Sequence, residues 1–165
     1  MAQVIGTKMP NGFAGSYSRQ PDMIVDTYNS LGTIGFGAPV KYGSGGVQAM
    51  GASAQASDFL GIAVREVKTA TNYFSQNEGS YVQYDAVPVM KRGRVNVLCQ
   101  RGTPAANGTV YVRVTANASY PTAVVGGFEA SSDSTNSVAL TNAKWHGAAD
   151  ANGIAELEIF YPLNA

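Results

Sequence analysis

The chain has 165 residues and a mass of 17.2 kDa, which suits one ordinary domain with a hydrophobic core of its own. Acidic and basic residues are equal in number, 11 each, and charged residues make up only 13% of the chain, so we expect neither nucleic acid nor a membrane among its partners. No stretch is apolar over the roughly 18 residues of a membrane-spanning helix, and Met1–Gly6 lacks the layout of a signal peptide, so we expect synthesis in the cytoplasm.

The first 36 residues predict an extended N-terminal arm. Their apolar side chains are scattered without helical or strand periodicity, and glycine and proline interrupt them repeatedly. One short strand, at Asp22–Asp26, is compatible with this arm. Because the segment is too poor in apolar residues to fold alone, we expect it to gain order against a neighbouring subunit. Phe13, Tyr17 and Arg19 are the residues that we expect to bind that partner.

Residues 37–165 predict an all-β domain, a compact antiparallel β-barrel or sandwich. In 109–115 the apolar residues alternate, so the three valines are expected inside and Tyr111 and Arg113 outside. Lys91–Gly93 predicts a turn between two strands, and Asp150–Gly153 predicts the turn of a hairpin. The window 50–59 allows one or two helical turns, and Thr115–Asn142 fits no pattern. The expected strands lie at 39–42, 59–65, 87–90, 94–100, 109–115, 143–149 and 154–161.

Residues that carry chemistry are scarce. His146 is the only histidine and Cys99 the only cysteine, so the chain cannot supply a zinc site from these two types. His146 has no nucleophile at a diagnostic spacing, and Cys99 lies in an apolar run where a thiol is inert. Glu156 and Glu158 share one strand face, as acids that keep an exposed edge soluble often do. We therefore expect no enzyme activity, no catalytic residue, no metal and no cofactor.

One cluster of basic residues interrupts this low-charge chain. It consists of Lys91, Arg92, Arg94 and Arg101. Aromatic residues are not interleaved with it, as they are in many nucleic-acid sites, and the net charge is zero. The cluster is interpreted as a solvated turn or as an ion-pair site between subunits.

Six segments, taken in order, resemble the structural cement or capsid-decoration proteins of tailed bacteriophages. They are Asn11–Arg19, Ile34–Val40, Phe59–Glu66, Asp85–Val97, Asn107–Val112 and Asp150–Leu157. The resemblance implies a virion structural protein that binds the assembled lattice of the major capsid protein and stabilises the head. It also implies assembly with itself, as a homotrimer, and a place on the outer surface of the capsid after synthesis in the host cytoplasm.

Two other classes stay open at this point. A fibre or carbohydrate-binding β-module would share the architecture and would present exposed aromatic residues around a groove. Its candidate aromatics are Tyr73, Phe74, Tyr81, Tyr84 and Trp145. A small β-fold enzyme is the third class, and the missing catalytic constellation argues against it.

Overall fold

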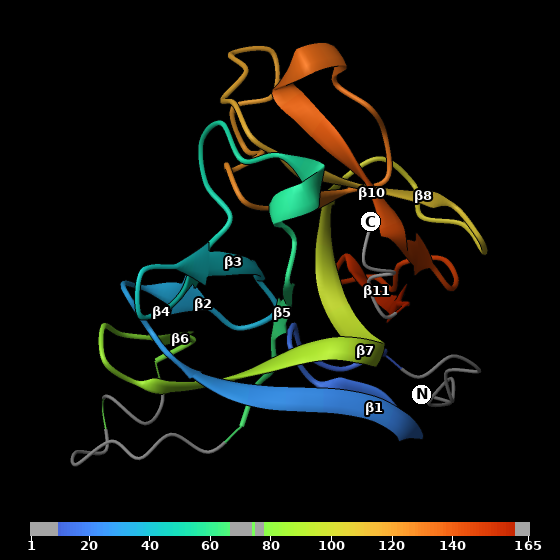
Figure 1. Ribbon diagram of the computed structural model, residues 1–165. Coiled ribbons are helices and arrows are strands. Elements are labelled where there is room, and N and C mark those ends of the chain that lie inside the picture. The colour runs from blue at the N-terminus through green and yellow to red at the C-terminus, as the bar shows by residue number, and fades with distance from the viewer. Residues whose placement is uncertain (1–9, 67–73, 75–77, 161–165) are drawn as a thin grey trace.

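The computed structural model describes residues 10–66, 74 and 78–160, and within these ranges the ordered elements are mainly β-strands (Figure 1). The all-β prediction is confirmed, because the period-two alternation of apolar residues is indeed that of half-buried strands. The elements are β1 (Tyr17–Asn29), β2 (Ile34–Gly35), β3 (Pro39–Gly43), β4 (Gly46–Ala49), β5 (Gly61–Ala63), β6 (Ser80–Tyr81), β7 (Ala86–Arg101), β8 (Thr109–Arg113), β9 (Phe128–Glu129), β10 (Ser137–Trp145), β11 (Ile154–Ile159) and the 3₁₀ turns η1 (Ala56–Asp58) and η2 (Ser134–Asn136).

Strand β7 organises the molecule. One of its edges pairs with β1, and the opposite edge pairs with β5 and then with β11. The prediction of a turn at Lys91–Gly93 is wrong, since β7 runs unbroken through these residues. Gly93 has a φ of +124°, so it accommodates a bulge of the neighbouring strand instead of reversing the chain.

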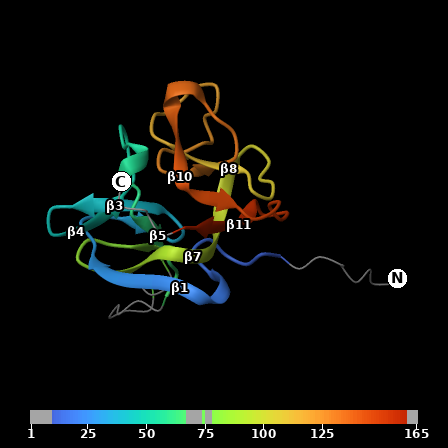
Figure 2. The same ribbon diagram turned by 45° about the vertical axis from the view of Figure 1, so that its right-hand side comes forward.

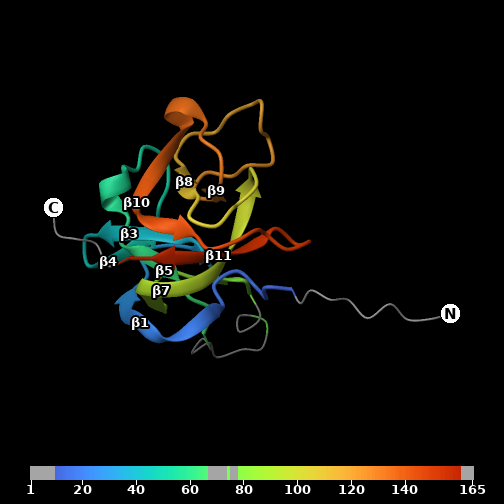
Figure 3. The same cartoon turned by 90° about the vertical axis from the view of Figure 1, so that its right-hand side faces the viewer.

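A closed ring of strands forms the larger half of the core. The order β11–β10–β8–β9–β7 returns to β11 through an additional pairing of β11 with β7 (Figure 3). Trp145, Leu157 and Val97 fill the ring, each at most 1% exposed. The predicted turn at Asp150–Gly153 is present beside it, where the amide of Gly153 donates to the carbonyl of Asp150.

A second apolar cluster is built from residues in or next to β2, β3, β4, β5, β6 and the first half of β7; the strands β3, β4, β5 and β7 are labelled in Figure 2. It contains eight buried residues, Ile34, Val40, Val47, Leu60, Ala63, Tyr81, Val87 and Val89. Because β7 contributes to both clusters, the two halves of the core are joined by one continuous strand.

The structure revises the separate N-terminal arm. Residues 17–29 are extended, but they form β1, which pairs with β7 from Ala86 to Val95. Before β1, the amide of Gly15 donates to the carbonyl of Asn96. An edge strand buries only part of one face, and a bulge interrupts this one, so no clean alternation marks it in the sequence. Residues 1–9 of the predicted arm lie outside the described residues.

Arg113 was expected to face solvent, and this prediction is wrong, because its side chain is 0% exposed. Its Nε donates to Glu129 Oε1 at 2.6 Å, and its Nη1 lies 2.9 Å from Asp133 Oδ2. Arg101 adds a second contact to Glu129, at 3.0 Å. This buried network fixes the segment that the sequence left unassigned, since Glu129 and Asp133 both belong to it.

Candidate partner interface

Two of the three residues predicted to bind a partner contact Arg65 and Glu66, which come one residue after the end of β5. The Phe13 ring is 69% exposed, and the guanidinium carbon of Arg65 lies 4.9 Å from its centroid. The Tyr17 hydroxyl donates a hydrogen bond to the Glu66 carboxylate. Burial and this hydrogen bond raise the pKa of Tyr17, so its hydroxyl stays protonated and keeps its donor proton.

The third residue, Arg19, makes a different contact. Its Nε lies 2.9 Å from Oε1 of Glu156 on β11. The structure therefore divides the three predicted residues between two places, and their binding to a partner stays a prediction.

A bulge in β1 shapes the surface around Arg19. Arg19 pairs with Arg94 and Ile24 pairs with Arg92, so the residues between them have only Gly93 opposite them. A Cβ atom on Gly93 would lie 2.9 Å from a backbone carbonyl oxygen of the bulge. Only glycine allows the bulge to approach β7 this closely.

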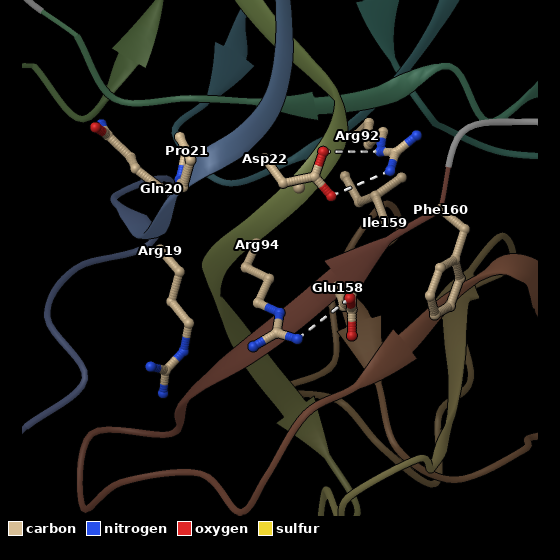
Figure 4. A pocket seen from close by; sticks show the side chains of 10 residues that line it. Arg19, Gln20, Pro21, Asp22, Arg92, Arg94, Glu158, Ile159 and Phe160 are labelled. Atoms are coloured by element: carbon tan, nitrogen blue, oxygen red, sulfur yellow. Dashed lines mark hydrogen bonds and ion pairs between the residues drawn. The ribbon is translucent and has the colours of Figure 1, made fainter.

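A groove of about 660 Å³ lies between this bulge and the end of β11 (Figure 4). Gln20 and Pro21 stand on the bulge side, and Phe160, which is 46% exposed, stands on the β11 side. We call it the ion-pair groove, and its lining consists of Arg19, Gln20, Pro21, Asp22, Arg92, Gly93, Arg94, Glu158, Ile159 and Phe160.

Each arginine of the ion-pair groove contacts a carboxylate of the same chain. Arg92 binds Asp22 through two nitrogens, both at 3.1 Å. Arg94 Nη2 lies 3.4 Å from Glu158 Oε1, and Arg19 pairs with Glu156. Lys91 lies 2.8 Å from Asp26 and Arg101 lies 3.0 Å from Glu129, so every member of the basic cluster contacts a carboxylate of its own chain.

His146 lies beside the ion-pair groove and contacts two of its residues. Its Nε2 lies 3.2 Å from an Arg94 nitrogen, and its Nδ1 lies 3.6 Å from Glu158 Oε2. These contacts place the only histidine of the sequence between an arginine and a glutamate of the ion pairs.

Another groove, of about 290 Å³, is lined by described residues that carry no charge. Leu98 is 49% exposed and Val124 is 64% exposed at this apolar groove. Sequence reasoning missed this groove for two reasons. Val124 belongs to the segment that fits no sequence pattern. Leu98 lies on β7, where Val95 and Val97 face the core and Leu98 faces the opposite side. Its apolar members are Ala14, Phe36, Ala38, Ala49, Met50, Leu98, Val124, Val125 and Phe128.

The five aromatic residues that a carbohydrate-binding module could use differ in exposure where the structure describes them. Tyr81 and Trp145 are each 1% exposed and belong to the two core clusters. Phe74 and Tyr84 are exposed, and Tyr73 lies outside the described residues. Two of the five candidate aromatics are thus unable to contact a glycan in this structure.

Over the described ranges, no three His, Cys, Asp or Glu side chains are grouped as a metal ion would require. A search of the same ranges for a helix with the length and apolar character needed to span a membrane found none.

Comparison with known proteins agrees with the architecture. Residues 1–160 match the family described as structural cement protein (E217 gp24/Pam3 gp6). A chain from the structure titled "The capsid of Myoviridae Phage XM1" shares the fold, with a TM-score of 0.73, 18% identity and 99% of each chain covered. No curated protein sequence matches. Since the family match spans nearly the whole chain, the protein belongs to the structural cement proteins of bacteriophages.

Proposed function

We propose that this protein binds the assembled lattice of major capsid subunits on the outer surface of the head and stabilises it. The observation that carries the proposal is the family match over residues 1–160, which makes the chain a structural cement protein. The similar fold of a chain from a phage XM1 capsid structure supports it. A low-charge chain with two grooves on its surface provides contact area for such a lattice.

The mechanism is binding without chemistry. A protein that binds the assembled shell and not the free subunits shifts the equilibrium toward the shell by RT ln(1 + [L]/Kd), about 2.7 kcal/mol per site when the free protein exceeds Kd 100-fold. Contacts to more than one subunit make each bound copy a bridge. The side chains needed are therefore anchors and ion pairs rather than a catalytic group.

The proposal includes partners and location. The major capsid protein and other copies of this chain, as a homotrimer, are the partners, and nucleic acid, membrane and cofactor are not. Several linked copies sum weak single contacts into stable attachment. The protein is made in the host cytoplasm and then joins the virion.

A reconstitution experiment tests the proposed function. Heads that lack this protein are mixed with the purified chain, and binding is measured by co-sedimentation while head disruption by heat is followed by light scattering. We expect saturable binding and a higher disruption temperature. Free capsid subunits, as the control, should bind the chain at least about tenfold more weakly, because each presents only part of the lattice site. Equal binding to heads and free subunits, or binding without stabilisation, would contradict the proposal.

A further inference from the structure

Three ion pairs lie in and beside the ion-pair groove, so charges of both signs occur there in equal number. Its three arginines, Arg19, Arg92 and Arg94, contact three carboxylates, those of Glu156, Asp22 and Glu158. A partner surface of one sign would attract half of these groups and repel the other half. A surface that itself alternates in sign satisfies both halves.

A second copy of the chain offers such a surface. A two-fold contact uses the same patch on both copies, and a patch that contains both signs side by side allows the groups of one copy to face groups of opposite charge in the other. The chain as a whole has a net charge of zero, so two copies do not repel one another at long range.

The shape of the surface is self-complementary in the same way. The bulge that carries Gln20 and Pro21 stands beside the hollow that Arg94, Glu158 and Phe160 border (Figure 4). When two copies face each other, the bulge of each can enter the hollow of the other. Phe160, at 46% exposed, and Ile24, at 38%, supply apolar area next to the charges.

The ion pairs have capacity for another partner. The side chain of Asp22 is 76% exposed and that of Arg92 is 46% exposed. A guanidinium has five N–H donors and a carboxylate accepts several hydrogen bonds, so a facing copy can bind these groups while the original pair persists. Burial in an interface also lowers the dielectric constant around the pairs and strengthens them.

We propose that the ion-pair groove is the contact surface for a second copy of this chain. The inference rests on the proposed function, in which several copies act on one shell, and it assigns the self-contact to a surface. Such a contact joins copies two at a time, so among trimers it would link one trimer to the next.

Complementary neutralisation tests this assignment. The acid-only variant keeps the three carboxylates and replaces the arginines, by Arg19→Gln, Arg92→Gln and Arg94→Gln. The base-only variant keeps the three arginines and replaces the carboxylates, by Asp22→Asn, Glu156→Gln and Glu158→Gln. Molar mass is measured by light scattering at high micromolar concentration. We expect each variant alone to associate at least about tenfold more weakly than the unchanged chain, and an equimolar mixture of the two to regain association.

Two controls separate this outcome from a loss of folding. Lys41→Gln removes one charge on β3, which does not line the groove, and should associate as the unchanged chain does. The single changes Arg92→Gln and Asp22→Asn alter the most exposed pair and repeat the test if a triple variant shows a lowered melting temperature. The proposal is overturned if the unchanged chain is monomeric, if the variants associate normally, or if the mixture stays dissociated.

Binding to heads distinguishes this failure from failure of the proposed function. If the chain self-associates through the groove but does not bind heads, the self-contact is supported and the cement role is contradicted. A chain that binds heads but shows no self-association would leave the cement role standing and remove the self-contact.

Discussion

Gly93 occupies a backbone conformation that other residues adopt only with strain, and it touches the bulge of β1. We expect Gly93→Ala to lower the free energy of unfolding by about 3 kcal/mol, because a positive-φ backbone and overpacking each cost about 1–3 kcal/mol. Gly45→Ala is the matched control, since Gly45 has a φ of +89° but would place its Cβ in open space. Its cost should be about 1 kcal/mol. Urea unfolding of both variants measures the difference, and equal losses would contradict the close contact.

Glu129 is the shared carboxylate of the buried network. Its side chain is 0% exposed and accepts hydrogen bonds from Arg113 and Arg101. Glu129→Gln should lower the free energy of unfolding by about 3–5 kcal/mol, because it removes one of the two carboxylates that compensate the buried Arg113 and the carboxylate that Arg101 shares with it. Glu158→Gln, at a partly exposed pair, should cost less than about 1 kcal/mol. Chemical denaturation measures both, and a small loss at Glu129 would mean that solvent reaches this network.

Asp133 gives the network a dependence on pH. Hydrogen bonds from Asn117 and the ion pair with Arg113 hold the pKa of Asp133 below its ordinary value of 3.8. A carboxyl with a lowered folded-state pKa contributes stability that is complete above its ordinary pKa and is lost as the pH falls through the folded-state pKa. We therefore expect Asp133→Asn to flatten the fall in unfolding free energy between about pH 4 and pH 2, measured by urea unfolding. Parallel curves for the two proteins would contradict this.

Strand β1 is part of the folded sheet, so we expect a truncation that removes it to unfold the protein. Tyr17, Met23 and Val25 pack against the first core cluster, and the strand covers one edge of β7. Deleting residues 2–30 should abolish cooperative thermal unfolding, because it exposes both the cluster and the β7 edge. Thr27→Ala, at an exposed position of β1, is the control and should unfold as the unchanged chain does. Circular dichroism measures both, and a folded truncation would instead support a detachable arm.

Elements with one regular buried face could be predicted from the sequence. In β8 and β11 every second residue is apolar and buried, so their alternation is visible without the fold. Strand β1 lacks this signal because it lies at an edge and contains a bulge. The sequence divides β7 into two predicted strands, because a glycine after two basic residues is typical of a turn. The bulge of β1 that Gly93 accommodates is not visible in the local sequence.

The candidate interface was only partly predictable, because its grooves join residues far apart in the sequence. The sequence interprets the basic cluster as a solvated turn or as an ion-pair site between subunits, whereas in the structure Arg92 and Arg94 pair with acids of their own chain, on β1 and β11. The buried position of Arg113 depends on Glu129 and Asp133, which lie 16 and 20 residues further along the chain. No local sequence pattern shows that the charge of an arginine is compensated by carboxylates so far along the chain.

At the scale of the whole molecule, the fold is a small closed ring of strands that shares β7 with a second apolar cluster. Its surface includes the ion-pair groove, which carries charges of both signs, and the apolar groove, which is lined by uncharged residues. This arrangement suits a protein that works by contact with several neighbours rather than by chemistry on a substrate.

Electron cryo-microscopy of native particles that contain this protein tests the cement role most directly. We expect density that fits this β-fold on the outer surface of the head, with each copy contacting at least two neighbouring capsid subunits. Density confined to the tail or a fibre, density inside the head, or copies that each contact a single capsid subunit would contradict the account.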